Sequence, residues 1–256
     1  MDLTKIVANS FKYPFRNIAK LPIICILFVL ISIVPFGMIF DNRYIVLIGA
    51  IAFFAFILIV PGYLLSIVRK GSIGSSAMPS LSLVDNLYDS IKVIALRAVY
   101  MIVPAAAFLI FLSTLGPASI DMLFNLKILE FLATFGLTIL LILVTYIVFE
   151  FLLFFAKARL AYFNSLSEAL KINRVISDIR NIGFFTIIKW IIIMAILINV
   201  ISFVTSFVMS IPYVGFLIYI GVVIPIIESI GNYSLGLLYS NIAKNNADYN
   251  LKKIRG

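Results

Sequence analysis

Long uncharged runs constrain this chain more than any other feature of its sequence. The runs at 21–40 and 44–68 contain no Asp, Glu, Lys or Arg, and each reaches the roughly 20 residues that a helix needs to cross a bilayer. In hydrocarbon every backbone N–H and C=O group must be paired within the protein, which leaves helices and closed barrels. Barrel strands alternate apolar and polar side chains, whereas these runs are apolar on all sides. We therefore predict an all-α, polytopic integral membrane protein.

The composition agrees with this class and argues against an enzyme. Hydrophobic residues make up 63% of the chain and charged residues 12%, whereas an ordinary soluble domain is about half apolar and about a quarter charged. The chain has no histidine and a single cysteine, Cys25, so the most common general base and metal ligand is missing. The sequence contains no glycine-rich phosphate loop, catalytic triad or zinc pattern. We expect a non-catalytic protein without cofactor or metal.

Six transmembrane helices are expected from the positions of the apolar runs. They lie at about 21–40, 44–68, 93–114, 128–156, 184–209 and 214–242. Amphipathic segments precede successive pairs of these spans, at about 1–20, 83–97 and 165–181. Two of the segments begin with a serine and an acid three residues apart, Ser82 with Asp85 and Ser165 with Glu168, which is the spacing of a capped helix start.

This order of elements predicts three tandem units within a single transmembrane domain that covers 1–256. Each unit consists of an interfacial helix followed by a two-span hairpin. The units lie at about 1–70, 81–159 and 165–242, and a polar tail follows at 243–256. Because each unit crosses the membrane twice, all three units are expected to share one orientation.

The basic residues predict which side of the protein faces the cytoplasm. Eighteen of the 20 Lys and Arg residues lie on the side that holds both termini, and only Arg43 and Lys127 lie on the other. The positive-inside rule places the basic side, with both termini, in the cytoplasm. There it would meet the anionic lipids of the inner leaflet of a cell membrane. No basic patch is interleaved with aromatic residues outside the spans, so we expect no nucleic-acid partner.

The amphipathic segment at 83–97 has a clear helical pattern. Its apolar residues recur at helical spacing and its polar residues lie opposite. The apolar set is Leu83, Leu87, Ile91 and Ile94, and the polar set is Asp85, Asn86, Asp89 and Lys92. We expect this helix to lie on the inner membrane surface, with Asn86 in water and Leu87 against lipid or protein.

Glu228 is the main candidate for a functional residue. It lies near the middle of the sixth span, close to Ser229 and Asn232. An acid at that depth is costly unless it is paired or protonated, so Glu228 either makes a structural hydrogen bond or serves a proton- or cation-linked site. A polar face of the fifth span is a further candidate for the same cavity, formed by Asn199, Ser202 and Ser206.

Glu150 is a candidate interfacial acid. It lies in the fourth span within two turns of Lys157, near the cytoplasmic end. A helix-stabilising or interfacial contact is the expected role.

The region at 62–104 resembles the domain of unknown function 4013 family, an archaeal family of membrane proteins. The resemblance rests on Gly62-Tyr63, Arg69, Gly74, Pro79, Leu87-Tyr88-Asp89, Lys92, Tyr100 and Pro104. Tyr13-Pro14-Phe15 and the segment at 158–163 are also similar, whereas Ser80-Leu81 and Ser90 depart from the family pattern. The family has no assigned activity, so the resemblance implies an architecture and an archaeal cell membrane.

Two classes of function are compatible with these features. The first is a non-catalytic membrane module that engages lipid or partner proteins through its cytoplasmic face. The second is a transporter or channel for a small solute or ion that uses Glu228. Short loops and sparse intramembrane charge favour the first, and a water-filled cavity reaching Glu228 would favour the second.

Overall fold

The structure is a computed structural model that describes residues 2–255, with the side chains at 120, 123 and 241–255 excluded. The described chain is helical and contains no strand. Six of its helical segments are long and apolar enough to cross a membrane, as the sequence predicts. The helices are α1 (Leu3–Arg16), α2 (Leu21–Ile39), α3 (Arg43–Ser72), α4 (Leu83–Thr114), α5 (Pro117–Phe124), α6 (Ile128–Phe163), α7 (Leu166–Ala169), α8 (Ile172–Ile182), α9 (Phe184–Ser206), α10 (Val214–Ile218) and α11 (Ile224–Arg255), with a 3-10 turn η1 (Phe207–Ser210) and a π-helical turn η2 (Tyr219–Val223).

Several helices extend beyond the spans predicted from the sequence. α3 continues to Ser72 and α6 to Phe163, past the expected ends at 68 and 156. The third span and its amphipathic segment form one helix, α4, and the connection between the third and fourth expected spans contains α5. The expected ends were placed at the first basic residues, but several of these cations are bonded inside the protein and the helix continues through them.

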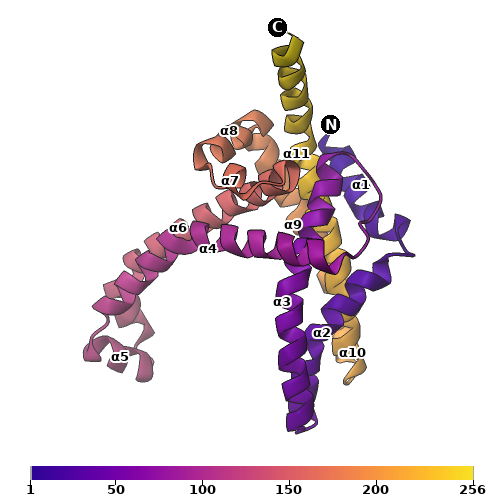
Figure 1. The fold of residues 1–256 in the computed structure, drawn as a ribbon. Coiled ribbons are helices and arrows are strands. Elements are labelled where there is room, and N and C mark those ends of the chain that lie inside the picture. The colour runs from indigo at the N-terminus through magenta and orange to yellow at the C-terminus, as the bar shows by residue number, and fades with distance from the viewer. Residues whose placement is uncertain (1, 256) are drawn as a thin grey trace.

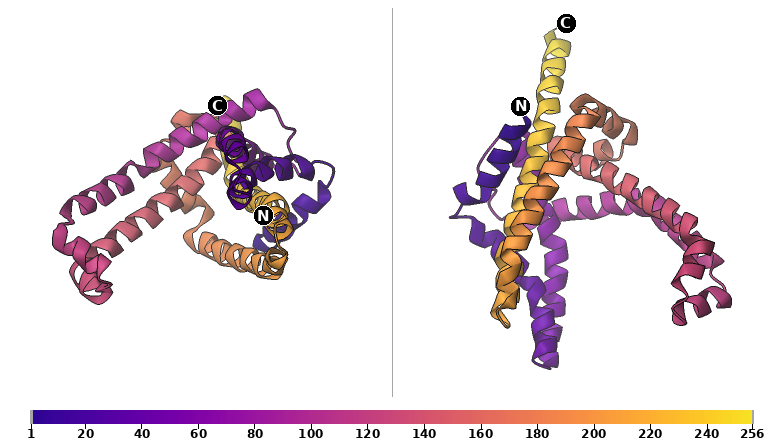
Figure 2. Two further views of the ribbon diagram at one scale, coloured as in Figure 1. Left: turned by 90° about the horizontal axis from the view of Figure 1, so that it is seen from below. Right: turned by 180° about the vertical axis from the view of Figure 1, so that it is seen from behind.

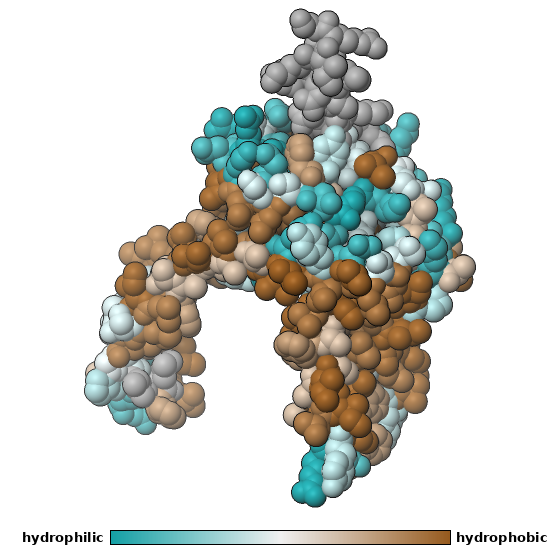
Figure 3. Space-filling view, viewed as in Figure 1, coloured by the Kyte–Doolittle hydropathy of each residue, from teal (hydrophilic) through white to brown (hydrophobic). Residues whose placement is uncertain are grey.

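α3 is the central helix of the arrangement. It makes its most extensive contacts with α2, α4 and α11. Figures 1 and 2 show α2 and α3 as a hairpin beside the α10–α11 segment, whereas α4 and α6 leave as a second hairpin with α5 at its tip. In Figure 3 these two parts form separate apolar legs below a hydrophilic region. The spans therefore diverge from a shared base.

Most of the hydrophobic core lies in that base, and the core extends into α2 and α9. Tyr63 of α3, Leu160 of α6 and Leu238 of α11 are fully buried. Within the most apolar stretch of each span, by contrast, the buried share ranges from 6% in α9–η1 to 33% in α10–α11. We call the packed base the hub: residues 60–72 of α3, 83–96 of α4, 153–163 of α6 and 229–240 of α11, together with α1, α7 and α8. Lipid tails are as apolar as leucine, so the exposed spans suit a bilayer.

Glycines allow the helices of the hub to cross closely. A Cβ atom on Gly62 would lie 1.9 Å from the backbone oxygen of Asn86 in α4, and one on Gly236 would lie 2.3 Å from that of Val68 in α3. Small residues permit such backbone contact between membrane helices. The aromatic rings of Tyr13 and Tyr233, with centroids 3.9 Å apart, stack α1 on α11, and burial raises the pKa of the Tyr13 hydroxyl. The hub is thus a tightly packed unit.

The polar face of the first half of α4 meets protein and not water. Asn86 is 2% exposed, so the prediction that it faces water is wrong, whereas Leu87 is 39% exposed. The polar face packs against α3, where the Ser90 hydroxyl accepts a hydrogen bond from the Gly62 N–H at 2.7 Å. An amphipathic pattern defines two faces but does not say which one meets protein. In α4 the polar face bonds α3, and the apolar face is left for lipid.

Candidate functional site

Three clusters of charged side chains lie in the hub, each centred on a cation near the end of a span. The central cations are Arg69 of α3 and Lys157 and Arg159 of α6. All three belong to the side that the sequence predicts as cytoplasmic. Each cluster joins helices that are distant in the sequence.

The Arg159 cluster is the most buried of the three. Its Nη1 donates to Asp178 Oδ2 at 2.7 Å, and its Nη2 donates to Glu168 Oε2 at 2.9 Å. Arg159 is 5% exposed and Asp178 4% exposed. Tyr239 Oη of α11 also donates to Asp178 Oδ2, at 2.6 Å. Lys171 and Arg159 donate to the Glu168 carboxylate and lower its pKa. The guanidinium thus ties α6 to α7 and α8, and the shared aspartate adds α11.

The Arg69 cluster has a similar design. Arg69 Nη2 donates to Asp89 Oδ2 of α4 at 2.8 Å, and Lys92 Nζ lies 3.3 Å from Asp89 Oδ1. Both cations also donate to Asn164 Oδ1, at 3.1 and 3.0 Å. The arginines bind aspartates 20 and 19 residues later in the chain, Asp89 for Arg69 and Asp178 for Arg159. In both clusters an arginine at the end of a span is paired with an aspartate of the amphipathic helix that follows.

Glu228 belongs to the third cluster. Its Oε2 accepts from Asn232 Nδ2 at 3.0 Å, and Asn232 Oδ1 accepts from Lys157 Nζ at 2.7 Å. The acid is therefore linked through an amide to a cation on another span. The sequence analysis missed Lys157 as an inward-facing partner, because it placed the end of the fourth span just before it. The length of that predicted span was the available signal. It is well above the roughly 20 residues that a helix needs to cross a bilayer, so its cytoplasmic end could be expected to pack inside the protein.

The other candidate residues make contacts within their own helices. Ser229 Oγ donates to the Ile226 carbonyl at 2.9 Å. On α9, Asn199 Nδ2 donates to the Ala195 carbonyl at 2.8 Å and Ser206 Oγ to that of Phe203 at 2.7 Å. Asn199 and Ser206 are exposed, and Ser202 is half-buried. The structure brings Glu228, Asn232 and Lys157 together, and the polar residues of α9 do not bond to them.

Glu150 makes an interhelical contact near the hub. Arg97 Nη2 of α4 donates to its Oε1 at 2.6 Å. Tyr146 Oη donates to the same oxygen at 3.0 Å. Glu150 therefore helps to hold α4 against α6.

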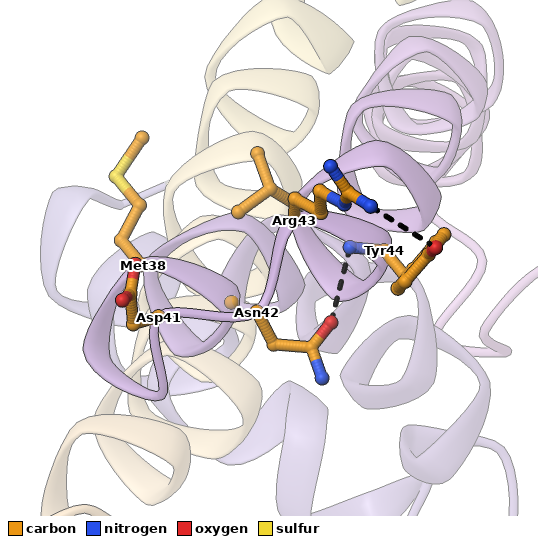
Figure 4. A pocket seen from close by; sticks show the side chains of 7 residues that line it. Met38, Asp41, Asn42, Arg43 and Tyr44 are labelled. Carbon is orange, nitrogen blue, oxygen red and sulfur yellow. Dashed lines mark hydrogen bonds between the residues drawn. The ribbon is translucent and has the colours of Figure 1, made fainter.

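Two pockets with polar linings lie at opposite ends of α3. The first, of about 680 Å³, surrounds the tight α2–α3 turn (Figure 4). There Asn42 Oδ1 accepts from the Tyr44 and Ile45 N–H groups at 3.0 and 3.3 Å, so its side chain caps α3. The second, of about 510 Å³, lies in the hub between α3, α4 and the loop at 73–82. Among the described residues, no group of three or more His, Cys, Asp or Glu is placed to hold a metal ion.

Comparison with known proteins returns one family. A family model described as "Protein of unknown function (DUF4013)" matches residues 44–211, a region that contains the Arg69 cluster, the Arg159 cluster except Tyr239, and most of the hub pocket. No curated protein and no solved structure matches the chain.

Proposed function

The chain belongs to the DUF4013 family, and we propose that it is a non-catalytic membrane module that engages lipid, and any partner proteins, through the hub. In this proposal the hub lies at the cytoplasmic face of the cell membrane, with both termini on that side. Its main ligands are the anionic lipids of the inner leaflet.

The distribution of packing and charge carries this proposal. The hub is tightly packed and holds the three charged clusters, whereas the spans expose apolar faces. α1 adds a basic and aromatic surface to the hub, because Lys5, Lys12, Phe11 and Phe15 are exposed. Basic and aromatic side chains on an amphipathic helix are the combination that binds an anionic membrane interface. Such a molecule would bind lipid at the level of the headgroups.

Transport of a small solute or ion is the second candidate. The charged Lys157–Asn232–Glu228 chain at the base of the spans is the observation that favours it, because charged groups at membrane depth often mark ion pathways. The polar residues of α9 do not extend this chain, and the two polar pockets described above are lined by other residues. We therefore rank transport below lipid engagement.

Lipid selectivity measured by electron spin resonance tests the proposal. The protein is placed in phosphatidylcholine vesicles that contain a trace of spin-labelled phosphatidylglycerol or spin-labelled phosphatidylcholine. We expect a larger motionally restricted fraction for the anionic lipid, and a difference that shrinks as salt screens the charges. Equal fractions at low salt would contradict lipid engagement.

A flux measurement on the same vesicles tests the alternative. We expect proton and cation flux equal to that of protein-free vesicles. A flux that Glu228→Gln abolishes, in a variant that keeps its helical content, would establish transport in place of the proposed function.

A further inference from the structure

The pocket of the hub has a lining that suits an anion. It lies between α3, α4 and the loop at 73–82, with a volume of about 510 Å³. Its lining contains four cations, Lys20, Arg69, Lys70 and Lys92, and two acids, Asp85 and Asp89, which gives a net charge of +2 (four minus two). We propose that this pocket binds a phosphate-bearing group. The proposal builds on the proposed function, which makes a lipid headgroup the expected source of the phosphate.

The acids of the pocket do not neutralise its cations. Asp89 is shared between Arg69 and Lys92, at 2.8 and 3.3 Å. The second acid, Asp85, accepts a hydrogen bond from the Ser82 hydroxyl at 2.6 Å.

Two cations of the lining have no counter-charge among the described side chains. Lys20 Nζ donates to a neutral acceptor, the Met78 carbonyl, at 2.9 Å and forms no ion pair within the described residues. Lys70 makes no ion pair with any described side chain. Lysine is a common phosphate binder in proteins, as a point charge.

An unpartnered amide gives a second and independent indication. Asn86 lines the pocket and is 2% exposed, and its Nδ2 is buried without a hydrogen-bond acceptor. A buried donor left without a partner costs about 1–3 kcal/mol. Rotation of the Asn86 side chain toward the pocket would let a phosphate oxygen supply the acceptor, since Nδ2 has almost no accessible surface in its present orientation. The same group would then satisfy the amide and the excess positive charge.

The position of the pocket fits a lipid phosphate. It opens beside α4, whose outward side chains Leu83 and Leu87 are exposed and apolar. In Figure 3 the hydrophilic surface over the hub meets the apolar legs along a continuous boundary. A bound lipid would place its phosphate on the polar side of this boundary and its chains along the apolar side. A free phosphate ion uses the same charges and hydrogen bonds but needs no apolar surface.

Calorimetric titration of the purified protein in neutral detergent tests the site. The probes are dihexanoyl phosphatidic acid, dihexanoyl phosphatidylcholine and inorganic phosphate. The test variant is Lys20→Gln/Lys70→Gln, and the control Arg43→Gln/Lys127→Gln removes the same charge from exposed positions on the side opposite the hub. We expect phosphatidic acid to bind, and its affinity to fall at least about tenfold in the test variant only, because each lysine makes a charge-assisted contact.

The outcomes separate the possible sources of the phosphate. Binding of inorganic phosphate as tight as that of phosphatidic acid, with the same loss in the test variant, would assign the site to a free anion. Weaker binding of inorganic phosphate would assign it to a lipid headgroup. Equal affinity of the wild type and the test variant, or an equal loss in the control, would overturn the proposal.

Two further measurements show whether the loss of binding is electrostatic and separate a failure of the pocket proposal from a failure of the proposed function. Lys20→Arg/Lys70→Arg retains both charges, so binding must recover in it if the loss was electrostatic. The spin-label measurement is repeated on Lys20→Gln/Lys70→Gln. If the wild type selects anionic lipid but the titration shows no dependence on the two lysines, the pocket proposal alone fails. If the pocket binds phosphate and the wild type shows no lipid selectivity, the proposed function alone fails.

Discussion

Arg159→Met is expected to lower the free energy of unfolding by about 3–5 kcal/mol, because it leaves the Asp178 carboxylate buried without its cation. The guanidinium makes three hydrogen bonds, two of them to carboxylates and one from Nε to the Glu168 carbonyl at 2.9 Å. Its loss also releases α7 and α8 from α6. Tyr239 remains as a donor to Asp178, but a neutral hydroxyl does not replace the charge.

Equilibrium unfolding in mixed micelles with increasing dodecyl sulfate measures this loss. The matched control is Arg180→Met, because Arg180 is an exposed arginine on α8, and surface substitutions usually change stability by no more than about 0.5 kcal/mol. The double variant Arg159→Met/Asp178→Leu should recover part of the loss, since it removes the unpaired carboxylate as well. A single variant as stable as the control would mean that the cluster does not hold the hub together.

The pair Lys157→Met and Glu228→Gln is expected to show strong coupling. Each single variant leaves a buried polar or charged group with an incomplete partner, at a cost of about 1–3 kcal/mol. Lys157→Met removes the donor to Asn232 Oδ1, and Glu228→Gln alters the acceptor of the Asn232 amide. Both substitutions act on the same partner, Asn232, so their effects are expected to depend on each other. The loss in the double variant should fall short of the sum of the single losses by about 1 kcal/mol or more.

The same unfolding experiment provides the double-mutant cycle. Ser240→Ala is a control on α11, because the Ser240 hydroxyl donates to the Leu237 carbonyl of its own helix, at 2.6 Å, and to no other helix among the described residues. Additive losses would show that Lys157 and Glu228 act independently. Such a result would contradict the amide-linked arrangement described here.

Much of the fold follows from run length and charge. The six spans, the all-α class and the family are confirmed, because a bilayer permits few alternatives for long uncharged runs. The ends of the helices were less accurate. Lys157 and Arg159 follow an apolar run as if they marked its exit, but both are bonded inside the hub. A basic residue after an apolar run does not mark the end of the helix when groups of the protein bond it.

The candidate site was harder to predict than the fold. Glu228 and Asn232 are four residues apart on one helix, so their contact follows from helical geometry, but Lys157 reaches them from another span. Asn199 and Ser206 share a helical face that meets no polar partner, since each bonds the carbonyl three or four residues earlier. The orientation of a polar face depends on tertiary packing, which a single sequence does not contain. Asn86 shows the same limit on α4.

The central claim is that the hub meets the inner leaflet, and labelling of single cysteines on intact cells tests it most directly. In a Cys25→Ala background, Ser80→Cys and Ser167→Cys report on the hub side, whereas Tyr44→Cys and Ala118→Cys report on the opposite side. All four positions have substantial surface exposure. An impermeant maleimide should label positions 44 and 118 in intact cells, and positions 80 and 167 only after permeabilisation. Labelling of positions 80 and 167 in intact cells, with positions 44 and 118 protected, would place the hub outside and contradict the account.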